Sequence, residues 1–416
     1  MKKDYYKLIV CLCCGRDNFL LPVLDLGPQV PANSYKKDIN EIQQKYPLGI
    51  QFCSHCNHLQ LTHIVFPDIL FKDYSYVSGT SKTGLNHFIE IAKKANNFCE
   101  EYNLPKVVLD IGCNDGTQLD CFKELGFETY GVDPAENLYD ISTKKGHNIK
   151  CGYFGISSLG LFLNKNISVI IAQNVFAHTD NPFNFLYNIN EIFKSNKDRQ
   201  GISFIQTSQA NMIKNNEFDT IYHEHCSYFN EYSMNNLVEM AGLKISNIDY
   251  YDIHGGSFLF SLVTPDFYNH LKKHNYVFFE KLFNLQLTEI DTYDNYKKNI
   301  LKIKEELVKL LLDLKSNNFK IIGYGAAAKG MTLINYTKIP LDYIIDDNPL
   351  KQNKFTPGSN IPIYSINKLK ELDPNEKIIF IPLAWNFYDE IYKRIKEVRN
   401  NVHDKFVRYF PEVRIN

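Results

Sequence analysis

Two imidazoles, a carboxylate and two phenols lie close together in the segment 222–228. Imidazole has a pKa near neutrality, so a histidine in this cluster is suited to act as a general base. The order His-Glu-His is similar to a metal-ligand run, but the H-E-x-x-H spacing of metalloproteases is missing. An extended backbone would place His223 and His225 on one face, because alternate side chains share a face. Tyr222 and Glu224 would then share the other face; the alternative is a polar core that merely satisfies both histidines.

Cysteines form a second group whose spacing suits chemistry. The segments 11–14 and 53–56 each contain a C-x-x-C step, which lets two thiolates from one turn face a single tetrahedral ion. Four protein ligands leave no open position, so such a metal would be structural rather than catalytic. Unmetallated surface cysteines are the alternative, and Cys13, His55 and His58 are alternative ligands. We predict a structural Zn²⁺ held by Cys11, Cys14, Cys53 and Cys56.

A first glycine loop, at 108–116, has the pattern of a strand that runs into a turn and then opens a helix. Glycine there lets the backbone approach a ligand closely. Asp133 ends the next predicted strand, where a carboxylate can accept both hydroxyls of a ribose. The G-x-G-x-x-G fingerprint of NAD sites is absent, so a nucleoside without a pyrophosphate, such as S-adenosylmethionine, fits better. The D-x-G-x-x-x-G loop of Asp110, Gly112 and Gly116 is thus a predicted methyl-donor site, with an unliganded turn as the alternative.

A second glycine loop, at 323–330, does match the G-x-G-x-x-G/A form, and Asp346 and Asp347 follow at about the right interval. Read alone, this loop would indicate NAD and an oxidoreductase. Lys329, at the start of the ensuing helix, suits a pyrophosphate equally well, as does the N-terminal dipole of that helix. The loop therefore indicates a phosphate-bearing nucleotide without showing which one, and a bare turn is the alternative.

The elements that must position these residues fall into three segments. Residues 1–72 are rich in cysteine, proline and turn signals. Residues 73–262 alternate short β-branched runs with helix-length stretches, which predicts a parallel α/β sheet. After a helical stretch the strand pattern restarts near residue 321 and predicts a second, smaller doubly wound unit. We expect an α/β protein with domains at 1–72, 73–262 and 263–416.

Composition narrows the class of protein. A chain of 416 residues is too long for one compact core, and 44% hydrophobic with 22% charged residues is ordinary for globular proteins. The net charge of -1 offers no basic excess for nucleic-acid phosphates. No apolar run approaches the ~18 residues that span a bilayer. We therefore expect a soluble, cytoplasmic monomer without nucleic-acid or membrane partners.

With these pieces in order, the chain resembles the sugar C-methyltransferase family of deoxysugar pathways, whose members make branched sugars such as mycarose. The resemblance covers almost the entire length. It rests on motifs in the family's order: the two C-x-x-C steps, L-G to A-N at 26–33, F-K-D-Y-S-Y at 71–76, D-I-G-C-N-D-G at 110–116, N-V-F-A-H at 174–178, F-D-T-I-Y-H-E-H at 218–225, H-G-G-S at 254–257, the second glycine loop, T-P-G at 356–358 and A-W-N-F at 384–387.

The resemblance implies an N-terminal zinc-ribbon-like domain, a central Rossmann-like S-adenosylmethionine methyltransferase domain, and a second Rossmann-like domain that holds a nucleotide-sugar. It makes the second loop a nucleotide-sugar site, not an NAD site. The implied catalytic residues are Tyr76, His178, Tyr222, Glu224 and His225. The residues implied to bind the methyl donor are Gly112, Asn114, Asp133 and Asn174. The sugar nucleotide falls to Tyr324, Gly325, Lys329, Asp346, Thr356, Pro357, Gly358, Trp385 and Asn386.

The expected reaction is methylation of C3 in a 4-keto sugar linked to dTDP, GDP or CDP, as part of deoxysugar, polysaccharide or capsule biosynthesis. A 4-keto group acidifies the C3 hydrogen, so we expect His225 to remove it while Tyr222, Glu224 and His178 orient the sugar. No catalytic metal is required. Sugar O-methylation, NAD-dependent oxidoreduction and a non-catalytic zinc scaffold are the competing hypotheses.

Two departures from the family pattern stand out. Gln206 replaces a usual glutamate, and Leu259 replaces a usual arginine after the H-G-G-S motif. Loss of a carboxylate and a guanidinium near the substrate would change which sugar hydroxyls or phosphates are held. We therefore expect a substrate that differs from the family's commonest dideoxy sugars.

Overall fold

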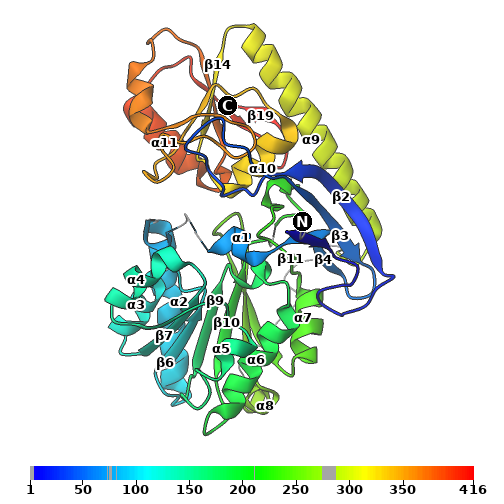
Figure 1. The fold of residues 1–416 in the computed structure, drawn as a ribbon, viewed down its shortest axis with the longest axis vertical. Coiled ribbons are helices and arrows are strands. Elements are labelled where there is room, and N and C mark those ends of the chain that lie inside the picture. Colours follow the sequence, from blue (N-terminus) through cyan, green and yellow to red (C-terminus); the bar gives the residue numbers. More distant parts are fainter. Residues whose placement is uncertain (1–3, 73, 75–76, 81, 210, 274–286) are drawn as a thin grey trace.

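The computed structural model describes residues 4–416 except 73, 75–76, 81, 210 and 274–286. Two α/β units lie at opposite ends of the molecule, and a smaller N-terminal sheet packs beside both (Figure 1). This architecture confirms the predicted α/β class. Within the described ranges, no helix is both long enough and apolar enough to cross a membrane.

The N-terminal sheet is antiparallel, with the strand order β11-β4-β3-β2. Its last strand, β11 (Ser227–Tyr228), comes from the centre of the chain and pairs with β4, so the catalytic cluster predicted above is joined to this sheet. The boundaries predicted at 72/73 and 262/263 stay predictions. The other strands are β2 (Leu20–Gln29), β3 (Tyr46–Cys53) and β4 (His58–Leu61), and β1 (Tyr5–Lys7) pairs separately with β5 (His63–Val65), which α1 (Pro67–Phe71) follows.

The central sheet has the order β12-β13-β10-β9-β6-β7-β8, and β13 alone runs antiparallel to the other strands. Successive strand residues face opposite sides. Val108 packs in a cluster with Ile91 of α2, whereas Leu109 packs in another with Ile189 of α6, so helices cover both faces. The strands are β6 (Val107–Ile111), β7 (Glu128–Asp133), β8 (Asn148–Cys151), β9 (Val169–Gln173), β10 (Ile202–Thr207), β12 (Lys244–Tyr251) and β13 (Ser257–Val263).

The helices of this unit are α2 (Lys82–Glu101), α3 (Thr117–Glu124), α4 (Glu136–Lys144), α5 (Ile156–Leu159), α6 (Pro182–Ser195), α7 (Glu231–Met240) and α8 (Pro265–Lys273). Three short 3₁₀ turns, η1 (Ser78–Thr80), η2 (Phe176–His178) and η3 (Phe218–Thr220), lie in its loops. Strand order reverses between β6 and β9, which opens a crevice at their carboxyl ends where ligands of such sheets bind.

The C-terminal sheet repeats this plan with the order β16-β15-β14-β17-β18-β19, and its reversal lies between β14 and β17. Only β19 is antiparallel to its neighbour. The strands are β14 (Lys320–Tyr324), β15 (Tyr343–Ile345), β16 (Ile363–Tyr364), β17 (Ile378–Pro382), β18 (Lys405–Arg408) and β19 (Arg414–Ile415), with α10 (Ala328–Thr337), α11 (Tyr388–Val398), η4 (Ile366–Glu371) and η5 (Trp385–Phe387) between them.

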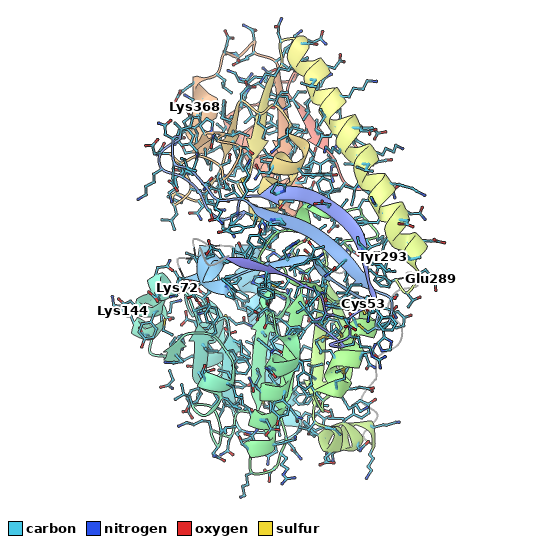
Figure 2. The ribbon with its side chains drawn as sticks, turned by 45° about the vertical axis from the view of Figure 1, so that its right-hand side comes forward. Cys53, Lys72, Lys144, Glu289, Tyr293 and Lys368 are labelled. Carbon is cyan, nitrogen blue, oxygen red and sulfur yellow. The ribbon has the colours of Figure 1, made fainter. Side chains whose placement is uncertain are left out.

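The long helix α9 (Ile290–Ser316) ties the units together. It runs alongside both the N-terminal sheet and the C-terminal unit (Figures 1 and 2). Its buried side chains recur at three- and four-residue intervals, which gives one apolar face. Tyr293 on that face contacts Phe52 of β3, with ring centroids 4.4 Å apart. One apolar cluster thus spans both sheets, α9 and the segment at Ile221.

Candidate functional site

The N-terminal cysteines form a compact thiol cluster. The sulfur atoms of Cys11, Cys14, Cys53 and Cys56 all lie within 4.8 Å of one another. The Cys11–Cys56 and Cys14–Cys53 sulfur distances are 3.5 and 3.8 Å. Zinc–sulfur bonds of ~2.3 Å in a tetrahedron require sulfurs about 3.8 Å apart, so this cluster fits Zn²⁺. Cys53, labelled in Figure 2, ends β3.

The alternative zinc ligands face elsewhere. The Cys13 thiol donates to the backbone oxygen of Ser233 at 3.2 Å, and His58 Nε2 lies 3.1 Å from Ser227 Oγ. His55 contacts the ring of Phe19. The cluster is therefore made by the four predicted cysteines.

A cavity of about 790 Å³ opens at the reversal point of the central sheet. Gly112, with φ of +75°, makes the turn after β6; a Cβ there would lie 2.3 Å from Val175 Cγ2, so no other residue fits. Asp110, Asn114, Asp133 and Asn174 also line the cavity. Gly116 has φ of +77° and directly precedes α3. It is not among the residues that line the described cavity. The first loop is thus built for close approach of a ligand.

Asp133 is held in place at the end of β7. Its carboxylate accepts the backbone N–H of Asn114 at 2.9 Å and that of Ala135 at 2.8 Å. Each carboxylate oxygen has a further lone pair, which suits the two hydroxyls of a ribose. Burial raises the pKa of Asp133, although the two N–H groups oppose the shift. Burial, with Asp133 nearby, raises the pKa of Asp110 well above its usual range.

Several buried amide atoms on the same wall lack protein partners. Both polar side-chain atoms of Gln173, Oδ1 of Asn174 and Nδ2 of Asn188 make no hydrogen bond to any described residue. Leaving such atoms unpaired costs about 1–3 kcal/mol each. All three residues line the cavity. A polar ligand such as a nucleoside bearing an amino acid fits this wall.

Tyr222 and His225 form a hydrogen-bonded pair in the cavity wall. A reverse turn, closed by the His225 N–H to the Tyr222 carbonyl at 2.9 Å, brings both side chains together. The segment 222–225 is therefore a turn rather than extended backbone, and the turn places residues i and i+3 side by side. The Tyr222 hydroxyl lies 2.7 Å from His225 Nε2, and both residues line the cavity.

The tautomer of His225 follows from its second contact. Nδ1 lies 2.8 Å from the Thr220 carbonyl, which can only accept, so Nδ1 carries the proton. Nε2 then holds a lone pair and accepts the Tyr222 O–H. Burial, with His178 nearby, lowers the pKa of His225 well below its usual range. The pair is thus a neutral imidazole joined to a phenol.

His178 completes this wall from η2. Its ring stacks on Phe71 with centroids 5.6 Å apart and lies 5.2 Å from the ring of His225. Burial lowers the pKa of His178 to about 4, so the ring is neutral at physiological pH. Tyr76, also predicted to be catalytic, lies outside the described residues.

Glu224 is hydrogen-bonded to two residues outside the pair. Its carboxylate accepts Asn33 Nδ2 at 2.6 Å and the Tyr74 hydroxyl at 3.0 Å. Burial raises the pKa of Glu224 to about 7. Asn33 and Tyr74 line the cavity, so Glu224 supports the wall from behind. His223 faces the Tyr46 carbonyl at 3.2 Å in the N-terminal sheet.

The second glycine loop reaches the same cavity from the C-terminal sheet. Gly325 has φ of +89°, and a Cβ there would lie 2.8 Å from Ala384 Cβ. Lys329 and Asn386 line the cavity, and Lys329 Nζ donates to the His254 carbonyl at 3.0 Å. Asp346 accepts the backbone N–H groups of Ala326 and Asn348, and the Tyr324 hydroxyl donates to Asp347.

Seven of the nine predicted substrate residues lie outside the described cavity lining, namely Tyr324, Gly325, Asp346, Thr356, Pro357, Gly358 and Trp385. Thr356 Oγ1 accepts the Ile361 N–H, and Pro357 and Gly358 form a turn packed against Asn335. Trp385 directs its indole N–H to Asp219.

Sequence reasoning missed several lining residues. His87 lines the cavity with Nε2 2.6 Å from Gln206 Oε1. Lys351 lies beside the second loop and donates to the Ala326 carbonyl at 2.7 Å. Gln206 thus contacts a cavity-lining side chain, whereas Leu259 is fully buried in the apolar core. The motif at 71–76 was the one signal for Tyr74, and isolated residues such as His87 and Lys351 gave none.

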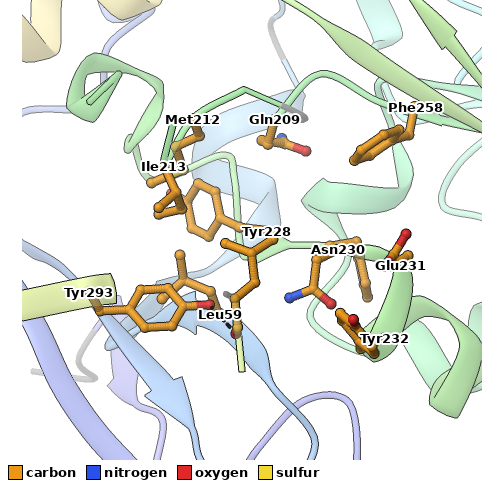
Figure 3. Close-up of a pocket in the computed structure, with 12 residues that line it drawn as sticks. Leu59, Gln209, Met212, Ile213, Tyr228, Asn230, Glu231, Tyr232, Phe258 and Tyr293 are labelled. Atoms are coloured by element: carbon orange, nitrogen blue, oxygen red, sulfur yellow. Dashed lines mark hydrogen bonds between the residues drawn. The ribbon is translucent and has the colours of Figure 1, made fainter. Parts of the chain in front are cut away.

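A second cavity near the site is small. About 30 Å³ lies between Met212, Tyr228 and Tyr293 (Figure 3), which is room for about one water molecule. This cavity excludes a sugar.

Comparison with known proteins agrees with this geometry. Residues 11–71 match a zinc binding domain, 86–247 a methyltransferase domain, and 252–411 a C-methyltransferase C-terminal domain. The C-methyltransferase NovU of Streptomyces niveus is 26% identical over 416 residues, covering 97% of this chain and 96% of NovU.

Solved methyltransferase structures match less than half of the chain. The plantazolicin methyltransferase BamL is 14% identical with a TM-score of 0.36, over 44% of this chain and 86% of BamL. The magnesium protoporphyrin IX methyltransferase ChlM of Synechocystis PCC 6803 is 13% identical with a TM-score of 0.31, over 44% of this chain and 81% of ChlM. Similarity at this level carries no inference about substrate.

Proposed function

We propose that this chain, which belongs to the S-adenosylmethionine-dependent C-methyltransferases with an N-terminal zinc-binding domain, methylates C3 of a nucleotide-linked 4-keto sugar. The observation that carries the proposal is one continuous cavity. The cavity extends from the point where strand order reverses in the central sheet to the corresponding point in the C-terminal sheet. Tyr222 and His225 lie in its wall between these two points. Such a cavity suits a donor nucleoside at one end and an acceptor nucleotide at the other.

Charge along the cavity supports this assignment. The acidic side chain of Asp133 lies at the central-sheet end, whereas the basic side chains of Lys329 and Lys351 lie at the C-terminal end. Lysine and the N-terminus of α10 both favour a phosphate. The acceptor is therefore expected to carry its negative charge at the second loop. NovU, a C-methyltransferase by name, is consistent with transfer to carbon.

The methyl donor supplies an electrophilic methyl group on a sulfonium; the protein must create a carbon nucleophile. The C3 hydrogen beside a ketone is acidic, because its loss gives an enolate. Tyr222 accepts the C3 proton as its own phenolic proton passes to His225 Nε2, so His225 is the final base. His178, neutral and stacked on Phe71, donates an N–H to the enolate oxygen. The Thr220 carbonyl fixes the His225 tautomer throughout.

Glu224 has a supporting role in this mechanism. Its hydrogen bonds fix Asn33 and Tyr74 in the cavity wall, where their orientation shapes the acceptor site. This differs from a direct contact between Glu224 and His225.

The direct test incubates the purified protein with S-adenosylmethionine carrying a ¹³C-methyl group and a panel of dTDP-, GDP- and CDP-linked 4-keto sugars. We expect one member to gain a methyl group by mass spectrometry, and the ¹³C NMR correlations of the product to place it on C3. The matched keto-free sugar nucleotides should remain unchanged. Methylation on oxygen, or no transfer to any keto sugar, would refute the proposal.

A further inference from the structure

Trp385 and Asp219 form a partly buried hydrogen bond between the C-terminal unit and the catalytic segment. The indole Nε1–H donates to Asp219 Oδ2 at 2.8 Å. Trp385 belongs to η5, directly after β17, and Asp219 belongs to η3, directly before the turn that holds Tyr222. Asp219 is fully buried, so its charge depends on the partners around it.

The indole is fixed behind the cavity wall. Its neighbours Ala384 and Asn386 line the cavity, while Trp385 is not among the described lining residues. A Cβ on Gly255 would lie 2.5 Å from Trp385 Cη2, so that glycine admits the ring. Lys329 Nζ lies 4.7 Å from the ring centre. The ring therefore has one well-defined position.

A short path joins this hydrogen bond to the reacting pair. Asp219 is bonded along the chain to Thr220, whose carbonyl accepts His225 Nδ1–H at 2.8 Å. His225 Nε2 in turn lies 2.7 Å from the Tyr222 hydroxyl. The loop at 384–386 is thus linked through Asp219 and Thr220 to the imidazole of His225.

We propose that Trp385 and Asp219 are positioning residues, which make the alignment of Tyr222 and His225 depend on the loop that binds the acceptor. This role rests on the proposed function, because the loop must hold the acceptor. It assigns Trp385 to alignment rather than to direct contact with the sugar nucleotide. An acceptor seated against Ala384 and Asn386 then stabilises the aligned pair.

The kinetic test is Trp385→Phe, which removes the indole N–H and keeps an aromatic ring. We expect kcat to fall about 10- to 100-fold, as for a misalignment of the reacting groups, while the acceptor KM changes less than about threefold. Asn299→Ala is the matched control, because it removes an exposed hydrogen bond from α9 to Asn216 in the same segment. The control should keep wild-type kcat. A Trp385→Phe enzyme with unchanged kcat, or with a loss confined to KM, would overturn the proposal.

A second readout needs no substrate. The imidazole resonances of ¹⁵N-histidine-labelled protein, with His225 assigned by His225→Asn, should shift at His225 in Trp385→Phe and not in Asn299→Ala. Unchanged His225 resonances would overturn the proposal even if no acceptor were ever found. Failure of the wild type to methylate any keto sugar refutes the proposed function alone, so the two results are distinguishable.

Asp219→Asn tests the same hydrogen bond with Trp385 in place, so this test does not depend on correct folding of Trp385→Phe. Asparagine keeps the size of the side chain and an oxygen that can accept the indole N–H. We expect Asp219→Asn to retain most of kcat, and the double variant with Trp385→Phe to be no slower than Trp385→Phe. A loss of kcat in Asp219→Asn as large as that in Trp385→Phe would show that the hydrogen bond between the indole and the side-chain oxygen does not align the pair, and would contradict the link. Binding of S-adenosylhomocysteine by each variant reports whether it is folded.

Discussion

At the scale of single residues, the hydrogen bonds of His225 decide which nitrogen can act. The Thr220 carbonyl takes Nδ1–H, which leaves Nε2 for the Tyr222 hydroxyl. Desolvation keeps the imidazole neutral, so it is ready to receive a proton at physiological pH. The same desolvation raises the pKa of the neighbouring Glu224 carboxyl. Burial thus lowers the pKa of His225 and raises the pKa of Glu224, because it disfavours the charged form of each side chain.

The pH dependence of stability tests the burial of Glu224. Its pKa is about 7 in the folded chain against an ordinary 4.5. Between these values the folded state keeps a proton that the unfolded state has lost, so the free energy of unfolding falls as the pH rises. Glu224→Gln removes this titration. The free energy of unfolding of the variant, taken relative to that of wild type, should therefore rise by on the order of 3 kcal/mol between pH 4.5 and 8. Urea denaturation of both proteins at both pH values measures this change.

Glu412→Gln provides the comparison, because this carboxylate is largely exposed. It should change the free energy of unfolding equally at both pH values. If Glu224→Gln behaves in the same way, Glu224 is ionised in the folded chain near pH 5 and the described burial is wrong.

At the scale of elements, short sequence patterns predicted what is local. The C-x-x-C steps predicted the thiol cluster, and the glycine loops after β6 and β14 lie at the reversal points of their sheets. Such patterns could not predict pairing between segments that are distant in the sequence. The strand β11 has two residues and depends on β4 for its existence, and the turn at 222–225 is set by that docking. The local sequence predicted neither the strand β11 nor the turn at 222–225.

Zinc binding is tested at the same scale. Cys14→Ser should abolish the bound zinc measured by mass spectrometry of the metal, and lower the free energy of unfolding by about several kcal/mol, because metal binding and folding of such sites are coupled. Cys13→Ser is the matched control, since the Cys13 thiol faces the Ser233 carbonyl rather than the cluster. Zinc retained in Cys14→Ser, or lost equally from both variants, would contradict the assigned ligand set.

At the scale of the whole molecule, two open α/β sheets place their ligand crevices toward one cavity. The apolar cluster that includes α9 and the N-terminal sheet holds the two units together. Asn33 from the N-terminal sheet, His225 from the centre and Lys329 from the C-terminal unit meet at this cavity. Their convergence could not be predicted from spacing, because it depends on packing between units. Residues without a motif, such as His87 and Lys351, enter the site only through that packing.

The central claim is that Tyr222 and His225 remove a proton from the carbon beside the acceptor's ketone. Exchange of that hydrogen in D₂O without methyl donor measures this step alone, by NMR of the sugar. Wild-type protein should exchange the C3 hydrogen of the acceptor that it methylates. Tyr222→Phe and His225→Asn should exchange it at least about 10²-fold more slowly, the usual loss for a general base, while binding S-adenosylhomocysteine as tightly as wild type. Exchange at the wild-type rate in both variants, or none in the wild type, would contradict the account.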